Sequence, residues 1–258
     1  MTQHIHPSAL IDPSAQIGDD VDIGPFAIIG PHTVIGAGCR IAARVTLERN
    51  VRLGLAVQIG TGSVLGGPPQ DLKFGGEETW VQIGDRTIIR EYSTVNRGTA
   101  ASGLTSVGSD CFIMTYVHLA HDCHVGNGVI IANGTQFAGH VTVEEYAVIS
   151  GLVAVHQFGT IGRYAFVGGM TRCNQDIPPY VKAVGNPVEL YGLNTVGLQR
   201  NGFSPETINS LKRAYRLFFN SDLNLGQATE RAKLDLPQTP EVERFVTFVS
   251  STHRGVPA

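Results

Sequence analysis

The 258-residue sequence predicts a mainly β protein, in which a parallel β-helix is followed by a small α-helical domain. Two observations predict this fold class. Aliphatic residues recur at every sixth position through most of the chain, and helix-start signals gather in its last quarter. The 31 glycines and the 7% share of aromatic residues also fit a repetitive, turn-rich fold.

The six-residue period is the main evidence for the β-helix. Between residues 5 and 167, 28 positions fall on this period, and 25 of them carry Ile, Leu, Val or Phe. Neither an α-helix nor an ordinary strand repeats at this interval, whereas three short strands in an 18-residue coil do. Glycine often follows the aliphatic residue, as at Gly18 and Gly24, where we expect it to give a tight turn its backbone freedom.

Two segments interrupt the repeat without shifting its phase. Residues 66–82 and 96–106 contain the three positions that miss the period, and their Gly, Pro and polar content is typical of projecting loops. We therefore expect a β-helical domain over residues 1–190 with two such loops. Asp71 and Lys73 in the first loop are either binding groups or solvated loop charges.

The remaining residues, 191–258, are expected to form a helical domain. Residues 176–192 resemble an irregular connector. Lys212, Arg213 and Arg216 cluster on one predicted helix, which predicts either a docking site for an acidic partner or a solvated face. The helices themselves are predicted from N-cap and N1 residues and from composition: they follow Ser204-Pro205 and Thr239-Pro240, with a third over residues 225–234.

Composition excludes several classes of function. A net charge of −3 argues against a nucleic-acid-binding protein that depends on bulk positive charge. No apolar run approaches the ~18 residues of a membrane span, and the first ten residues, MTQHIHPSAL, carry no secretory signal. Four cysteines without paired spacing fit a reducing compartment, so we expect a cytoplasmic protein.

Three histidines, an aspartate and a cysteine occur together in VHLAHDCHVG, residues 117–126. Such a cluster is typical of a zinc site, but the six-residue register favours another interpretation. Cys123 occupies a small inward position of the wall, as do two of the other cysteines in their coils. His118 and His124 fall on adjacent faces of the prism, so they are not expected to converge with His121 on one ion.

His121 instead belongs to a column of residues spaced by eighteen. Gly139 and Gln157 follow it at this spacing, and Asp122 stacks with His140 in the neighbouring column. A histidine beside a carboxylate is a general-base arrangement. Gly139 leaves space next to the imidazole and offers its N–H to a developing oxyanion. The alternative is a pair of polar residues that face solvent.

The segments AHDCHVGN, AGHVTV, AVHQFGTIG, PPQDLKFGGE, QDIPPYVKAVGNP and GLNTVGLQRNGFS together resemble the UDP-N-acetylglucosamine O-acyltransferases, hexapeptide-repeat enzymes of lipid A biosynthesis. The likeness runs over nearly the whole chain. It implies a left-handed parallel β-helix, a homotrimer with sites between subunits, and no cofactor or metal. It also implies that an (R)-3-hydroxyacyl chain passes from acyl carrier protein to the 3-position of the sugar in UDP-N-acetylglucosamine.

The resemblance assigns roles residue by residue. His121 matches the general base, Asp122 the residue that polarises it, and Gly139 the oxyanion donor. Further residues match contacts to the sugar, phosphate or nucleotide: Asp71, Lys73, His118, His140, Gln157, Asn194 and Arg200. The lining of the acyl groove is matched by Met114, Gly151 and Gly169.

The sequence departs from the family pattern at three places. Asn96 stands where better-known members carry histidine, and Asn201 where many have a second arginine. Pro187 stands where some members place the histidine that ends the acyl groove, which leaves the acyl length open.

Other functions remain as alternatives. They are the N-acyltransferase of the same pathway, a 3-amino sugar acceptor, a CoA-dependent acetyltransferase, a zinc-dependent anhydrase-like β-helix and a non-catalytic scaffold. The N-acyltransferase usually carries an additional N-terminal domain, whereas the repeat here begins at Ile5.

Overall fold

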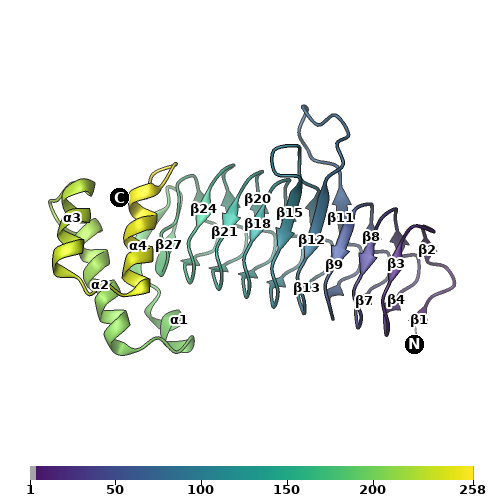
Figure 1. The fold of residues 1–258 in the computed structure, drawn as a ribbon, viewed down its shortest axis with the longest axis horizontal. Coiled ribbons are helices and arrows are strands. Elements are labelled where there is room, and N and C mark those ends of the chain that lie inside the picture. Colours follow the sequence, from purple (N-terminus) through teal and green to yellow (C-terminus); the bar gives the residue numbers. More distant parts are fainter. Residues whose placement is uncertain (1–3, 258) are drawn as a thin grey trace.

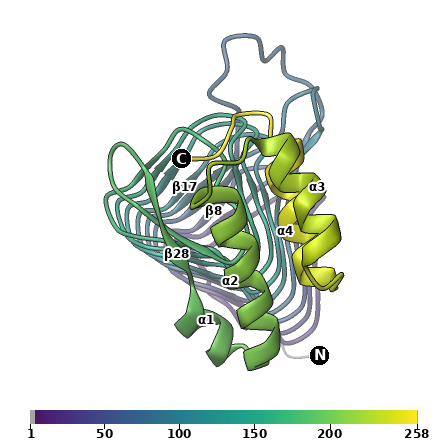
Figure 2. The ribbon, with the colours of Figure 1, turned by 90° about the vertical axis from the view of Figure 1, so that its left-hand side faces the viewer.

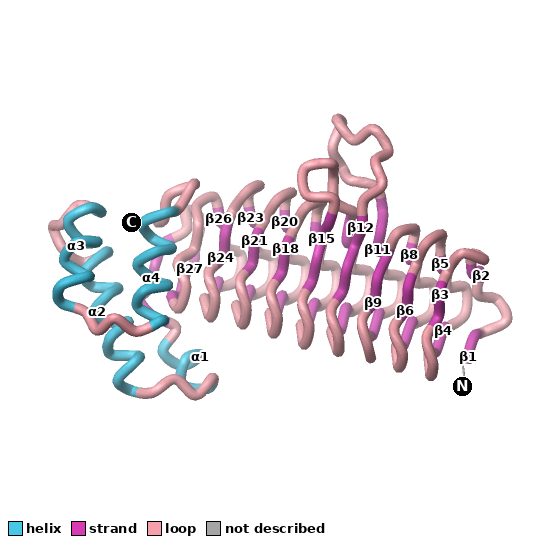
Figure 3. Tube along the Cα trace, viewed as in Figure 1, coloured by secondary structure: helices cyan, strands magenta, loops and turns pink. Residues whose placement is uncertain are grey.

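The computed structural model describes residues 4–257. They form a left-handed parallel β-helix whose C-terminal end is covered by helices (Figure 1). Seen along the helix axis, the coils superimpose as a three-sided prism (Figure 2). Short strands alternate with turns along the whole prism, as the colouring by secondary structure shows (Figure 3). The predicted fold class is confirmed.

Three sheets form the sides of the prism. The first sheet has the strand order β1 (His4–Ile5), β4 (Asp22–Ile23), β7 (Arg40–Ile41), β10 (Gln58–Ile59), β13 (Ile88–Ile89), β16 (Phe112–Ile113), β19 (Ile130–Ile131), β22 (Val148–Ile149), β25 (Phe166–Val167), β27 (Val181–Val184) and β28 (Glu189–Leu193). The second has the order β2 (Leu10–Ile11), β5 (Ile28–Ile29), β8 (Thr46–Leu47), β11 (Val64–Gly67), β14 (Thr94–Asn96), β17 (His118–Leu119), β20 (Gln136–Phe137), β23 (Ala154–Val155) and β26 (Arg172–Cys173). The third has the order β24 (Thr160–Ile161), β21 (Thr142–Val143), β18 (His124–Val125), β15 (Leu104–Val107), β12 (Trp80–Ile83), β9 (Val51–Leu53), β6 (Val34–Ile35) and β3 (Gln16–Ile17).

The register explains why the two loops leave the period intact. Most paired residues are eighteen apart, as Ile5 and Ile23 are. Leu65 pairs with Val95 across the first loop, a separation of 30, which is 18 + 12. Val95 in turn pairs with Leu119 across the second loop, a separation of 24, which is 18 + 6. Both insertions are multiples of six, so each strand beyond a loop presents the same side to the core.

Residues 68–79 and 97–103 lie outside the strands and form the two projecting loops. Both rise from the same corner of the prism, near its middle (Figure 1). The strands run further into these segments than the sequence predicts, because β11 continues to Gly67 and β12 begins at Trp80. The loop bases are therefore paired strand, and only the tips are free of the sheet.

The role that the sequence suggests for the repeated glycines is wrong. Gly18 and Gly30 do not have left-handed backbone; that conformation falls two residues later, at Asp20 and His32. A Cβ added to Gly30 would instead lie 1.8 Å from the carbonyl oxygen of Glu48 in the next coil. Glycine is needed here because two backbones approach closely, and not because the chain turns.

The predicted irregular connector is also wrong in part. Residues 181–193 contain the antiparallel pair β27–β28, which closes the first sheet. The boundary expected after residue 190 thus falls inside β28. This hairpin carries no six-residue period, and its two strands are joined by a Gly-containing turn that is not part of the repeat.

Four helices follow: α1 (Thr195–Arg200), α2 (Pro205–Phe219), α3 (Leu225–Asp235) and α4 (Pro240–Ser251). The last three confirm the predicted helices, and their N-caps accept backbone N–H groups as expected, Ser204 from Thr207 and Thr239 from Val242. Helix α1 was not predicted from the sequence. Within residues 4–257, none of the four helices has the length and apolar run needed to cross a bilayer.

Candidate active site

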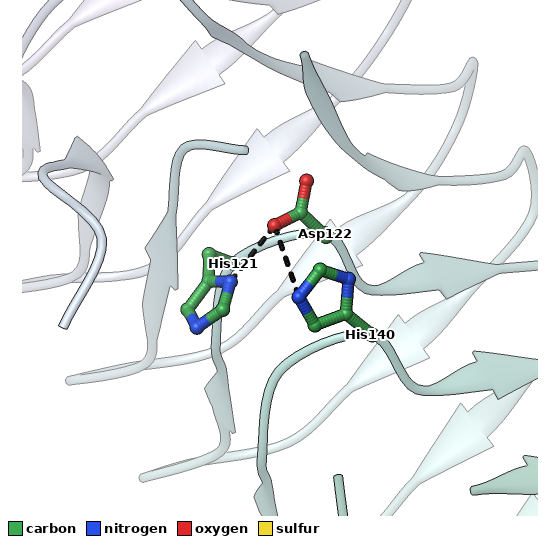
Figure 4. A group of neighbouring side chains, drawn as sticks. All are labelled: His121, Asp122 and His140. Carbon is green, nitrogen blue, oxygen red and sulfur yellow. Dashed lines mark hydrogen bonds and ion pairs between the residues drawn. The ribbon is translucent and has the colours of Figure 1, made fainter. Parts of the chain in front are cut away.

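His121 and Asp122 occupy the corner between β17 and β18, beneath the two loops. The His121 Nδ1 lies 2.8 Å from Asp122 Oδ2, and both side chains are buried, with exposures of 8% and 0% (Figure 4). Asp122 has a left-handed backbone, with φ of 59°. At this corner the usual alternation of side chains between the two faces of a strand does not apply, so adjacent residues can meet. The expected His–Asp contact is confirmed.

His140 comes from the next coil, and the predicted stacking is confirmed. Its backbone N–H donates to the His121 carbonyl oxygen at 3.0 Å, and its Nε2 lies 3.7 Å from Asp122 Oδ2 (Figure 4). The His140 ring packs edge-on against His121, with centroids 5.0 Å apart. On its other side, Phe158 stacks on it at 4.5 Å. The three side chains Asp122, His140 and Phe158 thus form one column of the corner.

Asp122 is held by donors from the second loop. Thr99 donates its N–H and its Oγ1, at 3.0 Å to Oδ1 and 2.7 Å to Oδ2, and the Ser102 hydroxyl donates to Oδ1. Burial alone would raise the pKa of Asp122, but the hydrogen bonds from Ser102, His121 and Thr99 outweigh it and lower the pKa to about 2. The carboxylate is therefore ionised at neutral pH although it is almost fully buried.

The imidazole of His121 is oriented by this carboxylate. Because Nδ1 contacts Asp122, the tautomer with Nδ1–H donating leaves Nε2 unprotonated. Within the described part of the chain, no hydrogen-bond donor or acceptor contacts Nε2, and the ring borders an open groove. A free Nε2 in this position can accept a proton from a bound molecule.

Gly139 lies directly against this ring. A Cβ at this position would be 2.5 Å from His121 Cε1 and 2.7 Å from Nε2, so no larger residue fits without moving the imidazole. Among the described residues none accepts the Gly139 N–H. The expectation of bare backbone beside His121 is confirmed, and a donor is available next to the base.

A groove of about 810 Å³ runs along the second sheet past this corner. Its lining brings together six of the residues that the sequence analysis named: Asp71, Lys73, His118, His121, Gly139 and Gln157. Asp71 and Lys73 reach it from the first loop, where the Lys73 N–H donates to Asp71 Oδ1 at 3.0 Å. The loop thus brings one carboxylate and one ammonium group to a wall that carries two histidines.

His118 and His124 lie on different faces, as predicted. His118 is in the second sheet and contacts Thr94 Oγ1 through Nδ1 at 2.7 Å, whereas His124 is in the third sheet and contacts Ser106. Burial, with a smaller contribution from His121, lowers the pKa of His118. A neutral His118 can donate or accept a hydrogen bond in the groove without adding charge.

Five of the named residues lie away from this groove in the single chain. Asn194 is the N-cap of α1, where its Oδ1 accepts from Gly197 and its Nδ2 donates to the Tyr164 carbonyl. Arg200 is exposed at the end of the same helix. The other three lie at the corner between the first and second sheets, after β16, β22 and β25: Met114, Gly151 and Gly169.

The cysteines fit packing positions, as the register predicts. All four are free and buried. Burial raises the pKa of the Cys123 thiol to about 12, and its Sγ donates to the Ala138 carbonyl, so it does not supply a thiolate ligand. The candidate ligand atoms of His121, Asp122 and His140 do lie within 4.8 Å of one another. Asp122 already accepts hydrogen bonds at both oxygens, which favours the acid–base interpretation.

Four further residues at this site are not among those predicted from the sequence. Thr99 and Ser102 bind Asp122 from the second loop. Arg97, also buried, donates to the Gly66 carbonyl at the base of the first loop. Arg254 donates to the Gln157 carbonyl from the C-terminal segment. Arg97 stands 24 residues before His121, which is the coil separation across the second loop, so the register could have indicated it. Thr99, Ser102 and Arg254 lie in segments outside the coils, where the repeat predicts no neighbours.

Comparison with known proteins identifies relatives over most of the chain. Residues 4–37 and 105–139 match the bacterial transferase hexapeptide repeat, and residues 176–257 match domain 2 of UDP N-acetylglucosamine O-acyltransferase. The acyl-[acyl-carrier-protein]–UDP-N-acetylglucosamine O-acyltransferase of Anaeromyxobacter dehalogenans is 46% identical over 192 residues, which are 74% of this chain and 75% of the relative. That of Burkholderia mallei is 43% identical over 204 residues, 77% of this chain and 78% of the relative.

Solved structures agree with these relatives. A UDP-N-acetylglucosamine acyltransferase from Bacteroides fragilis superimposes with a TM-score of 0.97 at 42% identity, covering 98% of this chain and 99% of that one. An Acinetobacter baumannii structure of the same family gives 0.95 at 40% identity, with the same coverage of both chains. The chain therefore belongs to the UDP-N-acetylglucosamine O-acyltransferase family.

Proposed function

We propose that this chain transfers an (R)-3-hydroxyacyl group from acyl carrier protein to the 3-hydroxyl of UDP-N-acetylglucosamine. The names of its relatives give the donor and the sugar nucleotide. One observation carries the chemistry. His121 Nδ1 is bound to the buried, ionised Asp122, while Nε2 faces the groove.

The proposed reaction follows from these positions. His121 Nε2 removes the proton of the sugar hydroxyl as the oxygen attacks the thioester carbonyl carbon. The carbonyl oxygen becomes an oxyanion, which the Gly139 N–H stabilises. When the intermediate collapses, the C–S bond breaks and the thiolate takes the proton from the His121 imidazolium. Asp122 stabilises that imidazolium through Nδ1. The products are the 3-O-acyl sugar nucleotide and the free thiol of the carrier, and His121 is neutral again.

We assign the remaining groove residues to substrate binding. Lys73 supplies positive charge for a phosphate, and Asp71 accepts hydrogen bonds from sugar hydroxyls. His118 and Gln157 line the wall beside the base and offer hydrogen-bonding groups, and His140 lies behind the base against Asp122. Because Asp71 and Lys73 are carried by a loop tip, their position depends on how the loop is anchored.

We propose a homotrimer, as the family resemblance implies. In the single chain, Asn194, Arg200 and the predicted acyl groove lie away from the His121 corner, so a neighbouring copy is needed to complete the site. The outer face of the first sheet supports such contacts, because its outward positions are apolar in five successive strands: Ile88, Phe112, Ile130, Val148 and Phe166.

The corner next to this face is also apolar and exposed. Tyr92 and Tyr116 stack there at 5.4 Å, and Leu152 and Met170 are 64% and 75% exposed. This is the corner that carries Met114, Gly151 and Gly169. An apolar ridge beside those residues fits both a subunit contact and an acyl chain. Replacing Ile130 with Glu is expected to convert the trimer to monomer and to abolish turnover, as measured by light scattering and by the transferase assay.

We propose the cytoplasm as the site of action. The support is chemical, because four free, buried thiols fit a reducing compartment. Fractionation of cells that produce the tagged chain would test the assignment, and recovery with secreted proteins would contradict it.

The function is tested with purified chain, UDP-N-acetylglucosamine and 3-hydroxyacyl carrier proteins of different chain lengths. We expect the 3-O-acyl product, and His121→Ala to lower kcat by ~10²-fold or more while the protein stays folded. His124→Ala is the matched control, because His124 lies on the neighbouring face and outside the groove. Parallel reactions with a 3-amino sugar and with acyl-CoA decide between the acceptor and donor alternatives. Undiminished turnover in His121→Ala would overturn the mechanism.

A further inference from the structure

The second projecting loop closes over Asp122 through two hydroxyl side chains. Thr99 is 9% exposed and Asp122 is 1% exposed. Three residues reach the carboxylate, and the Thr99 N–H is shared between the two oxygens, at 3.0 Å from Oδ1 and 3.2 Å from Oδ2. Thr99 N–H and Ser102 Oγ donate to Oδ1, and Thr99 Oγ1 and His121 Nδ1 contact Oδ2. The Asp122 backbone N–H in turn donates to Thr105 Oγ1 at 2.8 Å.

No lysine or arginine among residues 4–257 forms an ion pair with this carboxylate. The titratable groups that face it are His121, His140 and the thiol of Cys123, whose pKa is raised to about 12 so that it stays neutral. The ionised form of Asp122 is therefore stabilised by neutral donors more than by a cation. Two of these donors, Thr99 and Ser102, belong to a loop that shares no strand with the histidine.

We propose that Thr99 and Ser102 are positioning residues for the transfer reaction, which hold the Asp122 carboxylate ionised with Oδ2 aimed at His121 Nδ1 and so set the proton affinity of the His121–Asp122 pair. This inference rests on the proposed function. Neither residue touches the groove; both act through Asp122.

The direction of the effect follows from charge. Each donor disperses negative charge on the carboxylate. Without the donors, the carboxylate attracts the His121 imidazolium more strongly, or itself takes up a proton more easily. In both cases the pair holds its proton to a higher pH. The fraction of enzyme with a free Nε2 base then falls at the acid end of the pH range and is unchanged at the alkaline end.

The test compares Thr99→Val, Ser102→Ala and the double variant with the unmodified full-length chain. We expect the acid limb of the kcat/KM profile to move up by about one pH unit in each single variant and further in the double variant. Thr99→Ser restores the hydroxyl and should restore the profile. Ser106→Ala, which removes a hydroxyl next to His124, is the matched control and should leave the limb in place.

A second measurement separates this inference from the proposed function. The nine histidines of the chain can be labelled with ¹⁵N, and the His121 signal assigned by its loss in His121→Ala. Its titration midpoint should rise in Thr99→Val and Ser102→Ala even without substrate. A wild-type chain with no transferase activity would defeat the proposed function, while this shift would still support the positioning role.

Two results would overturn the inference. One is a uniform loss of rate in both variants with an unchanged pH profile and an unchanged His121 midpoint, which indicates support of the fold alone. The other is a Ser102→Ala variant that titrates as wild type while Thr99→Val does not. In that case the Ser102 hydroxyl donates its hydrogen bond to the Leu104 carbonyl, 2.9 Å away, and Ser102 has no role in positioning Asp122.

Discussion

The guanidinium of Arg254 donates through Nη1 to the backbone carbonyl of Gln157 at 3.1 Å, across 97 positions of sequence. The same side chain donates through Nε to the Asn174 carbonyl. Its backbone N–H lies 3.3 Å from Asp176, which also accepts from Thr252. The C-terminal segment around Arg254 is therefore hydrogen-bonded to the corner of the β-helix where His121, Gly139 and Gln157 stack in successive coils. It supports the wall of the groove although it never enters it.

Arg254→Ala is expected to raise the KM for the sugar nucleotide by about tenfold, since two charge-assisted hydrogen bonds to the wall beside Gln157 are lost. The effect on kcat should be small because His121 and Asp122 are not contacted. Steady-state kinetics measure both constants. Arg231→Ala, which removes an exposed ion pair with Asp235 on α3, is the control and should change neither. A change confined to kcat would contradict this prediction.

Gly139→Ala is expected to lower kcat by ~10²-fold, because the new Cβ would lie 2.5 Å from His121 Cε1 and push the proposed base away from the Gly139 N–H. Circular dichroism should show an intact β-helix. In Gly226→Ala, at a helical position, the added methyl meets only Asn224 Oδ1 at 3.5 Å, and this control should keep full activity. Wild-type turnover in Gly139→Ala would mean that the ring moves away from Gly139 in solution.

Arg97→Ala is expected to make the first loop, residues 68–79, more mobile, because it removes a side chain that anchors the base of the loop. Arg97 is 6% exposed, donates to the Gly66 carbonyl at 2.8 Å and lies 5.7 Å from the Phe74 ring centroid. Burial lowers its pKa, with a further contribution from Arg49. Its loss leaves a carbonyl at the loop base without this donor, which we expect to lower the free energy of unfolding by about 2 kcal/mol.

The readout of the Arg97 variant is thermal melting together with limited proteolysis within residues 68–79. Cleavage there should become faster, and the KM for the sugar nucleotide should rise, because the loop carries Asp71 and Lys73. Arg52→Ala is the matched control, since Arg52 is exposed and contacts Trp80 only through a cation–π interaction at 3.9 Å. An unchanged cleavage rate in Arg97→Ala would exclude the anchoring role.

Asp122→Asn is expected to remove part of the acid sensitivity of the fold. The pKa of Asp122 is about 2 in the native protein against 3.8 for a free side chain. A depressed pKa stabilises the folded state above the unfolded value, and this stabilisation is lost as pH falls through the native one. The difference in unfolding free energy between wild type and Asp122→Asn should therefore shrink by about 2 kcal/mol between pH 5 and pH 2.

Urea denaturation at fixed protomer concentration measures this difference, since the stability of the proposed trimer would depend on concentration. Asp222→Asn serves as the control, because Asp222 is exposed between α2 and α3 and forms no ion pair or hydrogen bond with the residues 4–257 that the structure describes. A gap that stays constant over this pH range would show that Asp122 is not held in its ionised form by the fold.

Much of the site could be predicted because the β-helix is periodic. Once a coil has eighteen residues, the neighbours of His121 one and two coils on are fixed as Gly139 and Gln157, and that of Asp122 as His140. The predicted inward cysteines follow from the same rule. The period also gave the wrong reason for Gly30, because a close contact between successive coils and a turn both favour glycine.

The contacts that the loops and the C-terminal segment make with the site could not be predicted from the eighteen-residue coil. Thr99 lies 23 residues from Asp122 and Arg254 lies 97 from Gln157, and neither separation is a multiple of eighteen. Where a loop returns depends on the packing and hydrogen bonding of its own side chains. The hairpin β27–β28 and helix α1 were missed for the same reason, since they lie beyond the repeat and are too short to have a period of their own.

The sequence by itself determined the three sheets of the β-helix, because each strand can pair only with the strand one coil away. Whether a side chain in the coils faces the core or the outside then follows from its position in the period. The sequence also placed an imidazole, a carboxylate and a bare glycine at one corner. Only the tertiary structure decided how that corner works. The second loop folds back so that Thr99 and Ser102 hold Asp122, and the C-terminal segment returns so that Arg254 supports Gln157. Such contacts join segments that do not share a repeat, so which residues meet depends on how the whole chain packs.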